Sequence, residues 1–167
     1  DEFAMGSSNE NSSKGNVLLE AANGSIELQL GHSSNNPAID AVKRIRLKTG
    51  EQAESTTSNI TLDNVLLEGG TGASNFSAIT LEAADDLQLL NGAKVSVLGT
   101  SFATGGLVVR AGGDLVMAGI SPSAVLETVN NADVYLDIDG DASIGRIDSG
   151  TGNIRLEVGG AVTEGGL

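Results

Sequence analysis

The stretch ITLEAA at residues 79–84 decides the fold, because the same short alternation of apolar and polar residues occurs six times along the 167-residue chain. The copies cover residues 17–22, 45–50, 79–84, 107–112, 134–139 and 154–159. A repeat on this scale is one supersecondary unit that cannot bury its own apolar face and must stack on copies of itself. The sequence therefore predicts an elongated solenoid, with function on a surface or an extension.

Each copy is predicted to be a β-strand, since apolar and polar residues alternate with a period of two. Shorter strands follow at a nearly fixed offset, and no helical pattern separates them, so the strands are expected to stack in parallel. The central inward residues lie 28, 34, 28, 27 and 20 residues apart: Leu19, Leu47, Leu81, Val109, Leu136 and Leu156. The shortest spacing sets the minimal coil, and loops at the corners lengthen the other coils. The longest of these loops are expected near residues 32–40, 51–59 and 69–77. The prediction is an all-β solenoid of five to six coils.

Stacking in register has a consequence for the outward residues at the centre of each copy. They would form one column: Glu20, Lys48, Glu82, Arg110, Asp137 and Glu157. Neighbours in a parallel sheet lie ~4.8 Å apart. The charges alternate in sign through the first five positions, which stabilises each pair by a few tenths of a kcal/mol, on the order of other exposed ion pairs.

Composition narrows the classes of function. The formal net charge is −13, which argues against binding to nucleic acid or to an anionic membrane. The chain has no cysteine and only four aromatic residues, which suits a narrow aliphatic core. No apolar run approaches the ~18 residues of a membrane span, so no membrane insertion is expected. Residues 1–13 are interpreted as a cloning scar followed by a disordered tail, and residues 14–167 as the repeat segment of a larger protein.

Three segments resemble the repeats of filamentous-haemagglutinin-type exoproteins: residues 106–115 (GLVVRAGGDL), 141–147 (DASIGRI) and 152–163 (GNIRLEVGGAVT). The resemblance implies a right-handed parallel β-helix within a large adhesin of a Gram-negative bacterium, exported by two-partner secretion. It further implies a secreted location at the outer cell surface and an outer-membrane transporter for the parent protein. The expected partners are a glycan or a protein on a host or neighbouring cell. The expected role is that of a stalk or an attachment surface.

One acidic run is a candidate calcium site. It comprises Asp137, Asp139 and Asp141, with Asp148 eleven positions after the first. Calcium takes six or more oxygen ligands, and such a run with a distal carboxylate can supply several. The alternative is a solvated acidic turn, because residues 134–139 fit the strand pattern and Ala142 stands where a calcium loop needs glycine. No other cofactor is expected.

The only basic cluster is a candidate patch for an anionic glycan. It consists of Lys43, Arg44, Arg46 and Lys48. Clustered cations attract sulfated or carboxylated polymers. The alternative is that these side chains pair with acids on adjacent coils, including Glu20 and Glu82.

No residue is assigned a catalytic role, and the chain is not predicted to be an enzyme. The alternative is a β-helical polysaccharide lyase or hydrolase, which would need convergent carboxylates in a cleft. The dense acidic groups are Asp85-Asp86 and the run from Asp137 to Asp141, whereas the sole histidine, His32, is interpreted as a plain loop residue. A β-sandwich is a third alternative, although two-residue hairpin turns are scarce. Unpaired edges at the ends of a solenoid predict capping by tail residues or end-to-end association.

Overall fold

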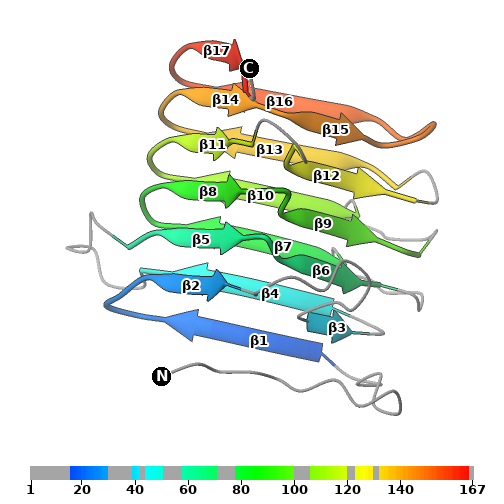
Figure 1. The fold of residues 1–167 in the computed structure, drawn as a ribbon, viewed down its shortest axis with the longest axis horizontal. Helices are drawn as coiled ribbons and strands as arrows, with labels where there is room; N and C mark the ends of the chain where they lie inside the picture. Colours follow the sequence, from blue (N-terminus) through cyan, green and yellow to red (C-terminus); the bar gives the residue numbers. More distant parts are fainter. Residues whose placement is uncertain are drawn as a thin grey trace.

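The computed structural model is a stack of β-strands (Figure 1). It describes residues 16–29, 39–41, 44–50, 58–70, 78–99, 106–119, 123–129 and 132–165. These residues form seventeen strands and no helix. The predicted tail at residues 1–13, Lys43, His32 and most of the three predicted long loops lie outside the described residues.

The strands form three parallel sheets. Sheet 1 contains β1 (Asn16–Ala21), β4 (Arg44–Thr49), β7 (Ile79–Ala83), β10 (Leu107–Ala111), β13 (Val134–Ile138) and β16 (Ile154–Val158). Sheet 2 contains β2 (Ile26–Gln29), β5 (Ile60–Asp63), β8 (Leu87–Leu90), β11 (Leu115–Met117), β14 (Ala142–Ile144) and β17 (Val162–Glu164). Sheet 3 contains β3 (Ile39–Ala41), β6 (Leu66–Gly69), β9 (Lys94–Val97), β12 (Val125–Thr128) and β15 (Arg146–Asp148).

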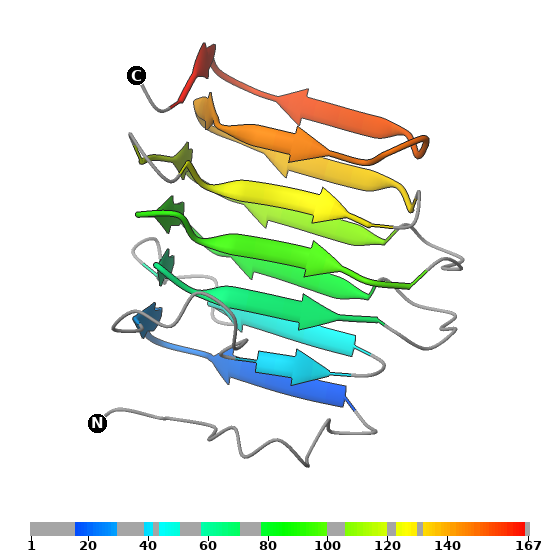
Figure 2. The same cartoon turned by 45° about the vertical axis from the view of Figure 1, so that its right-hand side comes forward.

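Successive strands go to successive sheets, so three consecutive strands make one structural unit. Each inner strand of a sheet pairs with the equivalent strands of the units before and after it, and each end strand pairs with one of them, as the colours in Figures 1 and 2 show. Every strand pairing in the described part of the chain is parallel. The six repeated segments are the six strands of sheet 1, so the predicted all-β class and parallel stacking are confirmed. Among the described residues no strands pair as hairpins, so the β-sandwich alternative is not supported.

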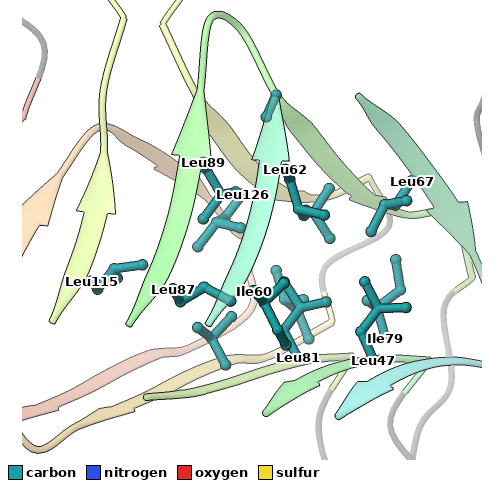
Figure 3. Close-up of a cluster of buried hydrophobic side chains, with 14 of the residues drawn as sticks. Leu47, Ile60, Leu62, Leu67, Ile79, Leu81, Leu87, Leu89, Leu115 and Leu126 are labelled. Atoms are coloured by element: carbon teal, nitrogen blue, oxygen red, sulfur yellow. The ribbon is translucent and has the colours of Figure 1, made fainter. Parts of the chain in front are cut away.

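The core lies between the three sheets and is aliphatic. Leucine and isoleucine side chains from all three sheets point toward one another, including Leu67, Leu81 and Leu89 (Figure 3). All three are fully buried. The core-facing residues predicted for the four middle copies in sheet 1 are buried as expected, whereas several in the first and last copies are partly exposed because no described strand covers one side.

The fifth unit shows how the shortest coil is built. Residues 134–153 contain β13, β14 and β15, and only Gly145 separates β14 from β15. A Cβ atom at Gly145 would lie 2.9 Å from the carbonyl oxygen of Ala124 in the unit below, so this tight corner requires glycine. The third unit instead turns at Asn91 and Gly92, which both have left-handed φ angles (51° and 82°). Corner length therefore accounts for the variable spacing of the repeats.

Candidate functional site: the charged face of sheet 1

The outward residues of sheet 1 form the predicted charge column. Glu20 pairs in register with Lys48, and Lys48 with Glu82. The column continues from Glu82 to Arg110, and then to Asp137 and Glu157. The register inferred from the sequence is thus confirmed at every position of the charge column.

Arg46 and Arg110 link this column into a network of ion pairs. Arg46 lies two residues before Lys48, at the neighbouring outward position of β4, and reaches diagonally to two acids of the column, Glu20 at 3.6 Å and Glu82 at 2.7 Å. Arg110 contacts the other carboxylate oxygen of Glu82 at 2.9 Å and Asp137 at 3.8 Å. Glu82 is therefore held between two guanidinium groups from the strands on either side of it.

The arginines set the protonation of Glu82. Partial burial works to raise the pKa of its carboxyl group, but the hydrogen bonds and positive charges of Arg46 and Arg110 outweigh burial, and the pKa lies below its usual value of 4.5. Glu82 is consequently a carboxylate at neutral pH.

Protonation of Glu82 at acidic pH is expected to destabilise the fold. A carboxyl group with a lowered pKa in the folded state stabilises the fold above its unfolded-state pKa, and this contribution is lost as the pH falls through the folded-state pKa. We expect the free energy of unfolding to fall as the pH drops below about 4.5, and to fall less steeply in Glu82→Gln. Urea titrations of the wild type and the variant across this pH range measure both slopes. A pH slope unchanged in Glu82→Gln would contradict the assignment.

At pH 7 a double-mutant cycle between Glu82→Gln and Arg46→Gln should give a coupling free energy of up to about 1 kcal/mol.

Tyr135 is packed among charges on the same face. Its ring lies between the guanidinium groups of Arg110 and Arg155, whose carbons are 6.0 and 5.4 Å from the ring centroid. Its hydroxyl donates a hydrogen bond of 2.8 Å to Glu157, which Arg155 also contacts. The hydrogen bond from Tyr135 lowers the pKa of Glu157, and the same bond raises the pKa of Tyr135. Sequence reasoning gave Tyr135 no such role, since only the register brings these side chains together.

A second column stands at the corner between sheets 1 and 2. In five successive units a polar side chain there accepts a hydrogen bond from the backbone N–H of the equivalent residue in the next unit, at 3.0, 3.1, 2.9, 2.8 and 2.7 Å. We call these residues the acceptor column: Ser25, Asn59, Asp86, Asp114 and Asp141. The column ties consecutive units together outside the sheets. The signal in the sequence is a short polar residue directly before the second strand of each of the first five units.

Asp114 tests the acceptor column. Asp114→Ala removes the acceptor for the backbone N–H of Asp141, and we expect it to lower the free energy of unfolding by about 1 kcal/mol. Asp114→Asn keeps an oxygen in the same place and should cost less than half as much. Equilibrium urea unfolding of both variants measures the difference. Equal losses in the two variants would show that the accepted hydrogen bond is not what stabilises the corner.

The four candidate calcium ligands lie on two sheets and a corner. Asp137 faces outward from β13 near Arg110, and Asp139 is exposed where that strand ends. Asp141 belongs to the acceptor column, and Asp148 lies on β15 in sheet 3, where it contacts Arg146 at 2.9 Å. Within the described residues, no three His, Cys, Asp or Glu side chains are arranged to hold a metal ion. Calcium binding stays a prediction.

Comparison with protein-family models, with curated proteins and with solved structures finds no match to this chain. In the described part of the chain, no helix has the length and hydrophobicity needed to cross a bilayer.

Three of the four residues of the basic cluster lie on one strand of sheet 1. Arg44, Arg46 and Lys48 lie on β4 and are half-buried, whereas Lys43 is outside the described residues. The contacts of Arg46 with Glu20 and Glu82 are those that the pairing alternative expected. Of the acids considered for an enzyme, Asp86 accepts a hydrogen bond from the backbone of Asp114. The face presents paired charges of both signs. Binding of an anionic glycan stays a prediction.

Proposed function

We propose that this chain is a right-handed parallel β-helix segment of a large secreted exoprotein of the filamentous-haemagglutinin type. In this proposal it acts at the outer surface of a bacterial cell as a stalk or an attachment surface. The observation that carries the proposal is the stack itself, in which six copies of one segment lie in register over a continuous aliphatic core. Repeats of this kind build extended molecules whose length grows with the number of units.

Three kinds of contact along the stack support a mechanical role as a stalk. The first five units bond to one another in all three sheets, and the described strands of the sixth bond to the fifth in sheets 1 and 2. The acceptor column adds hydrogen bonds at one corner, and the ion pairs of Glu82 join β4, β7 and β10 on the outside. Each unit is therefore fastened to its neighbour at its core, at a corner and on one face.

The charged face of sheet 1 is the proposed contact for a host or neighbouring cell, through a surface glycan or protein. The strand register spaces its charges regularly and alternates their sign, so a partner would meet a regular pattern of charge. The outer-membrane transporter would recognise the parent protein during export. No cofactor is required for either role.

Single-molecule stretching between the two ends of the chain tests the stalk. We expect force peaks in steps, because each unit of 20 to 34 residues should detach as a whole and release about 7 to 12 nm of chain. Smooth extension at low force would contradict a mechanical role as a stalk.

Binding of beads coated with the protein to cell layers, and of the protein to glycan arrays, tests attachment, with Arg110→Gln as the variant that alters the face. Cleavage of a polysaccharide in the same assay would replace the proposal with the enzyme alternative.

A further inference from the structure

The outward side of sheet 1 is far less acidic than the chain as a whole. The described strands of this sheet place five cations outward: Arg44, Arg46, Lys48, Arg110 and Arg155. They place four acids outward: Glu20, Glu82, Asp137 and Glu157. These five cations and four acids have a net charge of +1, whereas the whole chain has −13. Two copies of an acidic chain repel each other, so this face is where they can approach at the lowest cost.

The charges on this face are arranged symmetrically about its centre. The outward positions of β4 hold three cations: Arg44, Arg46 and Lys48. The register through β7 and β10 aligns Ile45 with Val134. The equivalent outward positions at β13 are therefore those of Asp133, Tyr135 and Asp137. β7 and β10 lie between these two strands, and each contributes one outward charge: Glu82 and Arg110. A basic strand and an acidic strand thus flank a middle that carries one charge of each sign.

A second copy turned end over end presents the complementary pattern. When β4 of one copy lies over β13 of the other, β7 lies over β10, and a twofold axis passes between β7 and β10. Lys48 then faces Asp137, and Glu82 faces Arg110, and each pair occurs twice. The side chains of Arg110 and Asp137 are 49% and 40% exposed, so they are open to a partner. Copies facing each other in the same orientation would instead bring like charges together, which costs several kcal/mol.

The outward residues beside the charge column fit the same arrangement. Two further pairs of residues would each occur twice: Arg44 with Asp133, and Arg46 with Tyr135, whose ring attracts guanidinium groups. Near the axis, Thr80 comes opposite Val108, and both are small and buried, so the middle of the face does not hold the sheets apart. The exception is Glu20, which comes opposite Glu157 at the two ends of the face.

We infer that the outward side of sheet 1 binds a second copy of this chain in the antiparallel orientation. The inference names the partner of the attachment surface proposed above and rests on that proposal. Stalks that project from two neighbouring cells toward each other meet in this orientation. The pairing uses only the side of the stack, so it does not depend on what lies above or below the described units.

The size of the face predicts a weak contact for one segment. Six strands of about five residues cover about 24 by 17 Å, or roughly 400 Å² on each copy. A total of about 800 Å² is at the low end for a transient complex. Charge pairs at such a surface set orientation and register more than affinity. Strength would come from many units that bind together along two stalks.

Two charge-reversed variants test the orientation. Lys48→Glu brings two carboxylates together at this pair, and Asp137→Lys brings two ammonium groups together, so each variant alone should associate more weakly than the wild type. In a mixture of the two variants both pairs again have opposite charges. We expect the mixture to associate at least about 10-fold more tightly than either variant alone. Sedimentation and light scattering at high protein concentration and low salt measure this, because salt screens exposed charges.

Lys94→Glu is the matched control, because it makes the same change of charge on sheet 3 and should associate as the wild type does. Circular dichroism checks the fold of each variant. If a reversed variant does not fold, Lys48→Gln and Asp137→Asn should each weaken the association of the chain. A mixture that associates no more tightly than its components would overturn the inference, and so would Asp137→Lys that associates as the wild type does.

The two proposals can fail separately. If the mixture does not associate but beads coated with the wild type still bind cell layers, the partner is not a second copy and the attachment proposal stands. If the mixture associates but the beads do not bind cells, the contact between copies is supported and the attachment proposal is wrong.

Discussion

Replacing Leu81 with alanine is expected to lower the free energy of unfolding by about 3 to 4 kcal/mol. Leu81 is fully buried at the centre of β7, and the strands on both sides place Leu47 and Val109 in the same column. The packed neighbours are parts of rigid sheets, so they cannot collapse into the space that the side chain leaves. Urea unfolding monitored by circular dichroism measures the loss.

Leu156→Ala is the matched control for this prediction. Leu156 belongs to the same column but lies in the last strand of sheet 1 and is 39% exposed. It already contacts water, so its truncation should cost only about 1 kcal/mol. Equal losses at the two positions would mean that the middle of the stack is no better packed than its end, contrary to the burial pattern.

The second large effect is expected at Gly140, which precedes Asp141 at the corner between sheets 1 and 2. A Cβ atom there would lie 2.2 Å from Oδ1 of Asp114 and 2.7 Å from the carbonyl oxygen of Gly113. Both atoms belong to the unit below, and Oδ1 of Asp114 also accepts the hydrogen bond from Asp141. Gly140→Ala must therefore push the two units apart, and we expect a loss of about 2 to 3 kcal/mol.

Gly24 occupies the equivalent corner of the first unit, directly before Ser25 of the acceptor column. A Cβ atom at Gly24 would meet no atom within 4 Å. Neither glycine has a left-handed backbone, so the two substitutions differ only in the space available. Gly24→Ala should be neutral or stabilise the fold by up to about 1 kcal/mol. Thermal and urea unfolding of the two variants side by side will show whether close contact between units is the reason for glycine at this corner.

The sequence was sufficient to predict the stacking of sheet 1, residue by residue. Period-two alternation identifies which side chains face inward, and six similar segments can be aligned by their central residues. A shift of one residue would turn the charge column into the core, so the register is strongly specified. The pairing of Arg110 with Glu82 and Asp137 follows from that alignment alone.

Contacts that depend on side-chain length or on the third sheet could not be predicted in the same way. Arg46 reaches diagonally to Glu20 and Glu82, which requires a long side chain in a particular rotamer. The acceptor column joins residues 20 to 34 positions apart through short polar side chains. The spacing from Asp137 to Asp148 resembles a calcium loop only along the chain, because two changes of direction carry Asp148 to sheet 3.

Each strand pairs only with the equivalent strands of adjacent units, and this has a consequence for how the molecule folds. Because each coil needs only the coil before it as a template, order can spread along the chain without waiting for remote segments to meet. A polypeptide that leaves a ribosome or a narrow channel one end first could therefore lay each new coil on the finished one. At any moment only the growing tip would be open to misfolding or aggregation.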